Sequence, residues 1–491
     1  MSDVSLNSGG APSLADSAAE GGAGARGRTT LARAGEEQEV RVESLAFGGD
    51  SVARLADGRV VFVRGALPRE RARVRLTRVK KSHAEAEAVE ILEPAPERTA
   101  PRCRHFGVCG GCRHQDLAYA AQLAWKTRQV QETLARLGGL RHVEVSPAIG
   151  MDDPWHYRNK MEFAIAGTDD RPVIGLRERG RFDRVFDLEE CPIFSPRAGA
   201  LAAAVEEHCR SRRYGVYDVR RSSGFLRHLL VRESKNTPDL LVGLVTSPGS
   251  IDARGFVAAV LEAVPATSIW HLVTSSRANL VEWGDARLLY GAERMSETIP
   301  PLHFEFGPGA FFQTNTFMAE TLYRRVREAA APDSSARRGT LVDLYCGIGA
   351  FALYLADGFE RVIGLEGLAA AIPDARENAR RNDVAHAEFH AGDDRTGFPE
   401  FLGRLPAGSV DTLLLDPPRG GVHARTLAAV RRLAPARLLY VSCNPASLAR
   451  DLAILTAAPA PYAVERVQPF DLFPHTPHIE TLVRLTPAAA G

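Results

Sequence analysis

The sequence predicts a multidomain protein: a small N-terminal β-barrel of the OB-like type, an α+β central part, and a C-terminal α/β domain built like a Rossmann fold. Three observations support this prediction. A chain of 491 residues exceeds what one hydrophobic core usually covers. Residues 37–93 contain short segments of alternating apolar and polar residues, separated by glycine-containing turns. From about residue 311, helical segments alternate with apolar strands, which is the pattern of a doubly wound, mostly parallel sheet.

The composition is that of a globular protein, with 45% hydrophobic and 25% charged residues. No segment approaches the roughly 20 consecutive apolar residues that a membrane-spanning helix needs. Residues 1–35 are rich in glycine, alanine and serine, which predicts a disordered extension, and they lack the apolar stretch of a secretory signal. We therefore expect a cytoplasmic protein with no membrane partner.

The predicted barrel occupies residues 36–95 and ends in the proline-containing linker Glu93-Pro94-Ala95-Pro96. Small closed β-barrels commonly bind oligonucleotides. Between Arg54 and Lys81 the chain has ten lysines and arginines against two acids, although the net charge of the whole chain is only +1. This segment is either a solvated basic face or a surface that binds phosphates in a sequence-independent, salt-sensitive way. The phosphate interpretation assigns contacts to Arg64, Arg69, Arg73, Lys80 and Lys81.

The central part is predicted to cover residues 96–310. A helical stretch at about 116–137 ends at a Gly-Gly pair, and the segment at about 115–146 is expected to pack on the C-terminal domain. Strand-like runs such as MEFAIAG, HLLVRES and DLLVGLVT, together with a helix near Arg197–Arg212, indicate an α+β arrangement whose topology the pattern does not specify.

Seven cysteines in a chain of this length do not make a disulfide scaffold. Three of them, Cys103, Cys109 and Cys112, fall within ten residues, and Cys191 follows 79 positions later with a proline after it. Four thiolates can bind a tetrahedral zinc ion or an iron–sulfur cluster. Close spacing plus a remote Cys-Pro favours the iron–sulfur cluster over zinc. Cys209, in a predicted helix, and Cys346, in the glycine turn, have no matching partners and are interpreted as structural.

The predicted C-terminal domain, residues 311–491, contains a strand, a glycine turn and a helix in the segment TLVDLYCGIGAFALYLA. The Gly347-x-Gly349 turn lets the backbone approach a bound nucleoside, and Glu366 ends the next strand, where a carboxylate can accept both ribose hydroxyls. Asp393 is assigned to the same predicted nucleoside site. The turn lacks the third glycine of a dinucleotide fingerprint, which disfavours hydride chemistry.

Two further strands end in chemistry-bearing residues. Asp416 opens the sequence Asp-Pro-Pro-Arg, a motif similar to that of methyltransferases that act on base nitrogens, and Cys443 follows 27 residues later in Ser-Cys-Asn-Pro. C5 of uracil is a poor nucleophile, but a thiolate that adds to C6 makes C5 able to attack an electrophilic methyl group. An exocyclic amine needs no such help. The cysteine therefore favours uracil C5 as the target.

Addition at C6 must be followed by removal of the C5 proton. Glu480 lies between a loop and the last strand and is the favoured base, with His475 and His478 as alternatives.

With these residues assembled, the chain resembles the RNA uridine-C5 methyltransferase family, in particular the 23S rRNA type that carries a TRAM domain and a [4Fe-4S] cluster. The resemblance covers nearly all of residues 37–485. Its motifs, in the family's order, are LTRVKKSHAEAEAVEIL, CRHFGVCGGC with a later CP, YRNKMEF, FFQTN, DLYCGIGAF, LLDPPRGG, SCNP and HIETLVRL.

The resemblance implies an S-adenosylmethionine-dependent enzyme that methylates a uridine in structured RNA, most simply 23S rRNA, as a monomer and without DNA. It implies Cys443 as the nucleophile and Glu480 as the base. It also implies a donor and target-base site lined by Gln313, Tyr345, Glu366 and Asp416, with Asp393 near the adenine. The cluster ligands implied are Cys103, Cys109, Cys112 and Cys191.

One departure from the family is Ala350, where Asn or Thr is frequent, so that a polar contact to the donor is missing. The alternatives are a tRNA uridine-C5 methyltransferase, a base-nitrogen or protein-glutamine methyltransferase, and a non-catalytic RNA-binding assembly factor. The intact set of candidate catalytic residues argues against the last of these.

Overall fold

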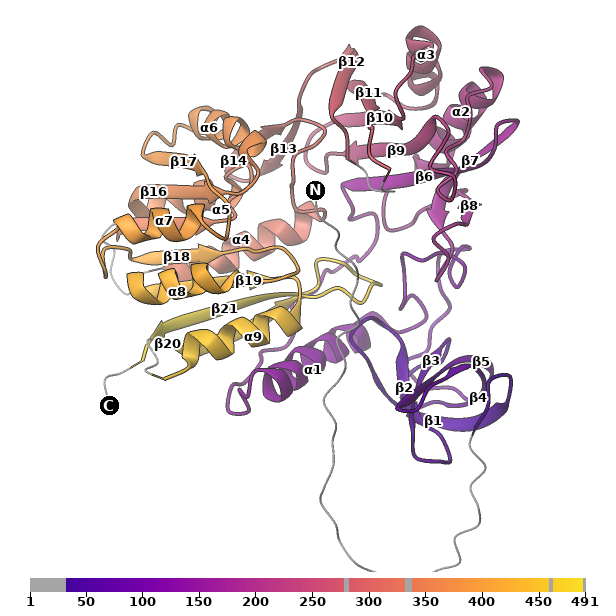
Figure 1. Ribbon diagram of the computed structural model, residues 1–491, viewed down its shortest axis with the longest axis horizontal. Coiled ribbons are helices and arrows are strands. Elements are labelled where there is room, and N and C mark those ends of the chain that lie inside the picture. Colours follow the sequence, from indigo (N-terminus) through magenta and orange to yellow (C-terminus); the bar gives the residue numbers. More distant parts are fainter. Residues whose placement is uncertain (1–31, 278–281, 332–337, 459–461, 489–491) are drawn as a thin grey trace, which may run out of the picture.

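The computed structural model describes residues 32–277, 282–331, 338–458 and 462–488. Figure 1 shows a C-terminal α/β domain built on a large sheet, with the N-terminal barrel and a central mixed sheet beside it. Of the extension predicted for residues 1–35, residues 1–31 lie outside the described residues. Ala32, by contrast, is buried in the barrel core.

The N-terminal unit is a closed barrel with the strand order β1-β2-β3-β5-β4. Every second side chain points inward, so that Val40 and Val42 on one strand meet Val61 and Val63 on another. The strands are β1 (Glu37–Leu45), β2 (Ser51–Arg54), β3 (Val60–Arg64), β4 (Arg71–Val79) and β5 (His83–Glu93).

Most basic side chains of the barrel pair with glutamates from neighbouring strands. Arg73 lies 3.0 Å from Glu90, and Arg75 lies 2.7 Å from Glu37. Further pairs are Arg64–Glu87 at 3.4 Å, Lys80–Glu85 at 3.9 Å and Arg69–Glu97. The acids come from β1, from β5 and from Glu97 just after the linker, all outside the basic segment 54–81. Because exposed ion pairs are weak, phosphates can still compete for these side chains, but the surface is less positive than the segment alone indicates.

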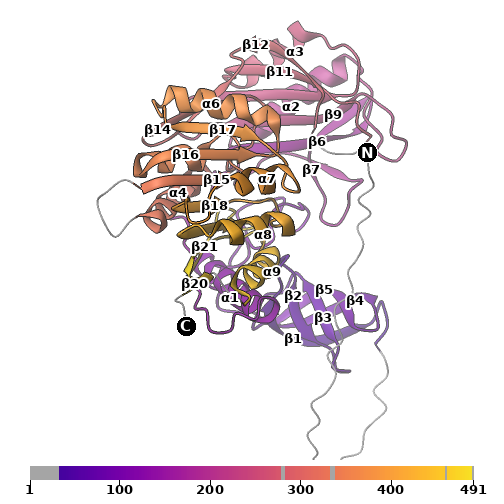
Figure 2. The same cartoon turned by 60° about the vertical axis from the view of Figure 1, so that its left-hand side comes forward.

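Helix α1 (Tyr119–Leu137) leaves the central part of the sequence and lies beside the C-terminal domain, next to α9 in both views (Figures 1 and 2). Val130 and Leu134 are fully buried in the same core as the helices of that domain. The chain then runs along the domain's edge strand, where the Ser146 amide donates to the Val467 carbonyl at 2.9 Å.

The central sheet has seven strands in the order β12-β11-β10-β9-β6-β7-β8, and only β10 and β11 are parallel. Helices α2 (Ala198–Ser211) and α3 (Ala253–Ala263) pack on one face, and the other face packs toward the C-terminal domain, so β9 is buried along nearly its whole length. The strands are β6 (Lys160–Thr168), β7 (Arg171–Arg177), β8 (Val185–Asp187), β9 (Leu226–Glu233), β10 (Leu240–Thr246), β11 (Ser268–Val273) and β12 (Asp285–Gly291).

A hairpin joins the central sheet to the C-terminal domain. It consists of β13 (Met295–Ile299) and β14 (Leu302–Phe306), and its side chains Ile299 and Phe304 are fully buried in the core of the C-terminal domain. The packing of that domain therefore begins before residue 311, the start predicted from the sequence pattern.

The C-terminal sheet has the order β17-β16-β15-β18-β19-β21-β20, with β21 antiparallel between β19 and β20. Helices α4 (Thr316–Ala330), α5 (Ala350–Leu355) and α6 (Ile372–Arg381) cover one face, while α7 (Gly397–Arg404), α8 (Ala424–Leu433), α9 (Pro445–Thr456) and α1 cover the other. The strands are β15 (Arg338–Leu344), β16 (Phe359–Glu366), β17 (Ala387–Ala391), β18 (Thr412–Leu415), β19 (Arg437–Ser442), β20 (Tyr462–Phe470) and β21 (Glu480–Pro487).

This order confirms the predicted doubly wound C-terminal domain. The connections reverse direction between β15 and β18, and ligands of such sheets bind outside the carboxyl ends of the strands at that point. Within the described segments, no helix is both long enough and apolar enough to cross a membrane.

Candidate active site

Four of the predicted site residues lie at the carboxyl ends of adjacent parallel strands. Tyr345 follows β15, Glu366 ends β16, Asp416 follows β18 and Cys443 follows β19. Because these strands are hydrogen-bonded side by side in parallel, their ends meet at one edge of the sheet.

The glycine turn after β15 holds Glu366 in place. The Glu366 carboxylate accepts hydrogen bonds from the amides of Gly347 at 2.9 Å and Leu368 at 2.7 Å. Gly347 and Gly349 have positive φ angles of 55° and 85°, which glycine adopts without strain. A Cβ atom at Gly347 would meet no atom within 4 Å, so the space above the turn is open to a ligand.

Asp343 is a site residue that sequence reasoning left without a role. It is fully buried near the end of β15, where one oxygen accepts from the Ala352 amide at 3.0 Å and the other has no hydrogen-bond partner among the described residues. Burial and the neighbouring Asp416 raise the pKa of Asp343 well above its usual range. In the sequence, an acid within the otherwise apolar strand segment LVDL could have marked Asp343 as a site residue.

Asp416 completes a group of three carboxylates with Asp343 and Glu366. Burial and the neighbouring Glu366 raise the pKa of Asp416 to about 7. Negative groups that are crowded in this way favour a cationic ligand, because a positive charge relieves their repulsion. A sulfonium compound therefore matches the electrostatics of this pocket.

Cys443 and Glu480 lie opposite one another across two antiparallel strands. The register pairs Ser442 of β19 with Thr481 of β21, which places the two flanking residues together. Burial, together with the neighbouring Glu480 and Asp416, raises the pKa of the Cys443 thiol to about 12. These surroundings favour the protonated thiol at neutral pH.

Glu480 is a buried carboxyl group, 3% exposed, and its Oε1 has no hydrogen-bond partner among the described residues. Burial and the neighbouring Asp416 raise its pKa well above the usual range, while Arg419 opposes the shift. Arg419 also lowers the pKa of Cys443. The arginine of the Asp-Pro-Pro-Arg motif is thus a second site residue to which sequence reasoning assigned no role.

The loop 471–479, which leads into Glu480, is held by several distant parts of the chain. Lys126 of α1 forms a buried ion pair with Asp471 at 2.5 Å, and the Asn315 side chain donates to the Leu472 carbonyl at 2.9 Å. The Tyr157 hydroxyl donates to the Pro474 carbonyl at 2.9 Å. These contacts fix the start of β21, and with it the position of Glu480.

His475 and His478, the alternative bases, have structural surroundings. The His475 ring stacks on Trp155 with the ring centroids 4.0 Å apart, and its carbonyl accepts from the Arg113 amide at 2.8 Å. Burial lowers the pKa of both histidines to about 4. His478 lies 3.2 Å from Arg419, so it is close to the site but has little basicity.

The other residues predicted to contact the donor are Gln313, Tyr345 and Asp393. Gln313 is buried in the segment before α4, where its carbonyl accepts from the Asn159 side chain at 2.7 Å. The Tyr345 ring meets Phe398 edge-on with centroids 5.1 Å apart. The Asp393 carboxylate is exposed and accepts from the amides of its own turn, and the Thr396 hydroxyl and these amides lower its pKa to about 2. Ala350 is the first residue of α5 and offers no polar group there.

The four clustered cysteines come together beside the central sheet. Burial and the neighbouring Cys109 and Cys103 raise the pKa of Cys112 to about 12. Burial and the other three thiols of the group also raise the pKa of Cys191. The Gly111 amide points at the Cys109 sulfur at 3.3 Å. Among the described residues, no group of three potential ligands is spaced to hold a single metal ion. Cys209 and Cys346 are buried in apolar cores.

Comparisons with known proteins identify relatives of this chain. Residues 290–487 match the model of the tRNA (uracil-5-)-methyltransferase family, and residues 32–89 match that of the TRAM domain. An uncharacterized RNA methyltransferase of Nitratidesulfovibrio vulgaris is 37% identical over 91% of this chain and 95% of that protein. Another, of Halalkalibacterium halodurans, is 34% identical over 91% of this chain and 96% of that protein.

Among solved structures, the Pyrococcus abyssi tRNA (uracil-54, C5)-methyltransferase in complex with S-adenosyl-L-homocysteine is similar, with a TM-score of 0.72 and 28% identity. The match covers 91% of this chain and 99% of that one. The predicted TRAM domain and the predicted enzyme class, an S-adenosylmethionine-dependent methyltransferase, are confirmed. The chain belongs to the RNA methyltransferase family of these relatives, and its C-terminal part matches the tRNA (uracil-5-)-methyltransferase model.

Proposed function

We propose that the protein transfers a methyl group from S-adenosylmethionine to C5 of a uridine in structured RNA through a covalent bond between Cys443 and C6. The observation that carries the proposal is the position of Cys443 opposite Glu480 at the strand ends, beside the three carboxylates. A base-nitrogen or glutamine methyltransferase needs no thiol at this position.

In the proposed reaction the partly exposed Cys443 thiol gives its proton to solvent, and the thiolate adds to C6, which moves the ring electrons onto C5 and O4. C5 then attacks the methyl carbon, whose bonding pair stays on the donor sulfur. Arg419 favours the thiolate, because it is the cation beside Cys443 that lowers the thiol pKa. The target base has to leave its stack to reach both groups.

Glu480 is proposed as the base that removes the C5 proton. The C–H electrons re-form the C5–C6 double bond and the Cys443–C6 bond breaks, which releases the product. A buried carboxylate with a raised pKa is a stronger base than an exposed one, so the surroundings of Glu480 suit this step.

The proposed RNA is 23S rRNA, following the motif set and the family type that it resembles. A second candidate is tRNA, because the similar Pyrococcus abyssi enzyme is a tRNA (uracil-54, C5)-methyltransferase. Transcripts of both RNAs made with 5-fluorouridine test the chemistry and the target together. Fluorine at C5 cannot leave as a proton would, so the correct RNA should form a protein adduct that survives denaturing electrophoresis. If neither transcript forms an adduct in the presence of the donor, the covalent proposal is wrong.

The carboxylate group predicts a pH dependence of donor binding. Asp416 has a pKa of about 7, and only its ionised form attracts a cation, so affinity for S-adenosylmethionine should rise with pH. Between pH 6 and 7.5 the ionised fraction grows about eightfold, which sets the largest expected gain. Calorimetric titration across this range measures it. Asp416→Asn should flatten the profile.

Asp393→Asn is the matched control for this experiment. Its carboxylate has a pKa of about 2 and stays ionised throughout the range, so the slope should remain in that variant. A flat profile in the unmodified protein would place Asp416 away from the donor.

We also propose that Cys103, Cys109, Cys112 and Cys191 hold a [4Fe-4S] cluster. Cys103, Cys109 and Cys112 all lie near enough to Cys191 to raise the pKa of its thiol, so the four can act as one ligand set. Three closely spaced cysteines and a remote Cys-Pro favour an iron–sulfur cluster over zinc. The methyl transfer requires no electron, so the role of the cluster is structural.

Anaerobically purified protein should accordingly be brown and contain iron and sulfide. Cys191→Ser should lose both, because one of the four ligands is removed. Cys209→Ser is the matched control, since that thiol is also buried but lies in α2 and is not one of the four proposed ligands. Stoichiometric zinc without iron in the unmodified protein would reject the cluster.

A further inference from the structure

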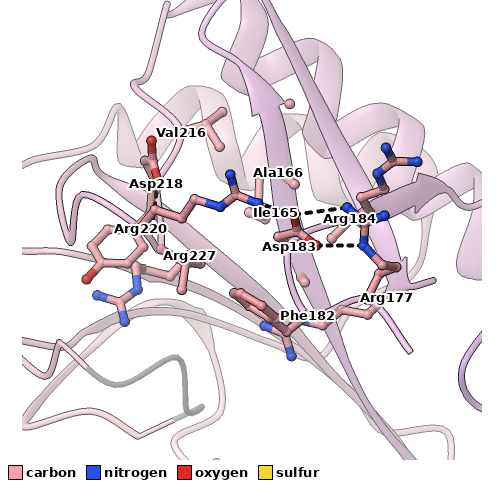
Figure 3. A pocket seen from close by; sticks show the side chains of 16 residues that line it. Ile165, Ala166, Arg177, Phe182, Asp183, Arg184, Val216, Asp218, Arg220 and Arg227 are labelled. Atoms are coloured by element: carbon pink, nitrogen blue, oxygen red, sulfur yellow. Dashed lines mark hydrogen bonds and ion pairs between the residues drawn. The ribbon is translucent and has the colours of Figure 1, made fainter. Parts of the chain in front are cut away.

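The central sheet carries a pocket of about 510 Å³ outside the methyl-transfer site. Its walls come from β6, the end of β7, the segment from there into β8, and the loop 216–220 before β9 (Figure 3). The volume is in the range of pockets that accept one small organic ligand.

The lining of this pocket is strongly basic, with five arginines and two aspartates. Asp183 is shared between Arg181 at 3.1 Å and Arg220 at 2.5 Å, and Figure 3 shows Arg220 reaching across toward it. Arg177, in contrast, forms no ion pair with any described residue, and burial lowers its pKa without a compensating acid. Arg184 lies 3.9 Å from Glu178, so three of the five arginines have acid partners, as most do in the barrel.

The pocket also contains aromatic rings in positions that suit stacking. Phe182 is 65% exposed, although a ring of this size is usually buried, and it lies at the rim beside the arginines. On the opposite wall the Arg227 guanidinium lies 3.6 Å from the centroid of the Tyr217 ring and donates to the Ser276 carbonyl at 3.0 Å. An exposed ring among guanidinium groups is the combination that binds single-stranded nucleic acid.

The cysteine-containing loop supports the basic end of β7. The Gly110 amide donates to the Arg177 carbonyl at 2.9 Å, and the Arg179 amide donates to the Val108 carbonyl at 2.7 Å. Beyond Arg179, a Cβ atom at Gly180 would lie 3.9 Å from the Arg64 guanidinium of the barrel. Basic groups therefore continue from the barrel to the pocket.

We propose that this pocket binds one nucleotide of the substrate RNA other than the target uridine, with its base on Phe182 and its phosphate at Arg177. The inference rests on the proposed function only in that RNA is the substrate. Charge and stacking together favour a nucleotide over a peptide, because a peptide has no phosphate to compensate Arg177. The pocket would add affinity at a distance from the chemistry and help to select a particular RNA fold.

The test measures RNA binding by the full-length protein, with 23S rRNA and tRNA transcripts as probes, at several salt concentrations. Phe182→Ala should weaken binding about tenfold, as expected for one lost stacking contact, with little change in salt dependence. Arg177→Gln should weaken binding and reduce the salt slope by about one unit, as expected for one lost phosphate contact. Phe182 is exposed, so its replacement leaves the core intact even if Arg177→Gln fails to fold.

Arg254→Gln is the matched control, because Arg254 is an exposed arginine on α3 outside the pocket. Donor binding should be the same in all variants. If Phe182→Ala and the control bind both transcripts equally well, the proposal is overturned. Binding of inorganic phosphate that Arg177→Gln abolishes, with RNA affinity and salt slope unchanged in the same variant, would also overturn it, in favour of a small-anion site. A loss of RNA affinity in a protein that forms no 5-fluorouridine adduct would support the pocket and reject only the covalent mechanism.

Discussion

Replacing Cys443 by alanine is expected to abolish methylation, with turnover falling by about 10⁴-fold or more, as for other lost nucleophiles. Without addition at C6, the ring electrons stay delocalised and C5 does not attack the methyl group. Transfer of labelled methyl groups from the donor to RNA measures the loss. The 5-fluorouridine adduct should disappear in parallel, because the same bond is missing.

The variant should still bind RNA and donor. The Cys443 side chain follows β19 and is only half-buried, so its removal leaves no large cavity in the core. Cys209→Ala is the control for loss of a cysteine elsewhere, and it should keep full turnover if the protein remains folded. Methylation of C5 by the Cys443→Ala protein would show that the reaction does not use a covalent adduct.

Replacing Glu480 by glutamine is expected to stop the reaction one step later. The amide has nearly the same shape as the carboxylate, but it does not accept the C5 proton. Addition and methyl transfer should proceed, while elimination slows by about 10²- to 10⁴-fold, the usual contribution of a positioned base. A methylated RNA–protein adduct should therefore accumulate with ordinary, unfluorinated RNA, and labelled donor with denaturing electrophoresis detects it.

Glu465→Gln serves as the matched control. Glu465 is an exposed carboxylate on the neighbouring strand β20, where it pairs with Arg484 at 2.8 Å. Its replacement should neither slow turnover nor accumulate an adduct. Normal turnover of the Glu480→Gln protein would assign the base role to another group, and the low basicity of His475 and His478 would then direct attention to bound water.

Much of the fold and the main chemistry could be predicted from the sequence, because both depend on short motifs. The glycine turn, Asp416 and Cys443 each follow an apolar strand directly, and a parallel sheet brings strand ends together whatever the rest of the chain does. The same reasoning found the barrel from its alternating residues. In each case, residues adjacent in sequence carry the pattern.

Other features were decided only by the tertiary structure. In the sequence, the basic segment of the barrel has few acids beside it. Its ion-pair partners lie mainly on β1 and β5, and the strand register determines which side chains meet. Asp343 and Arg419 gain their importance from neighbours on other strands.

The position of Glu480 depends on contacts between residues that lie far apart in the sequence. Its loop is held by Lys126, Tyr157 and Asn315, of which Lys126 lies 345 residues from its partner Asp471. The arginine pocket likewise combines three stretches of the central sheet whose local patterns are those of ordinary strands and turns. The sequence by itself determined which groups stand at the strand ends, because local hydrophobic pattern sets where a strand stops. The folded structure decided how charged those groups are and what holds them in place, because burial and long-range contacts set pKa values and loop positions.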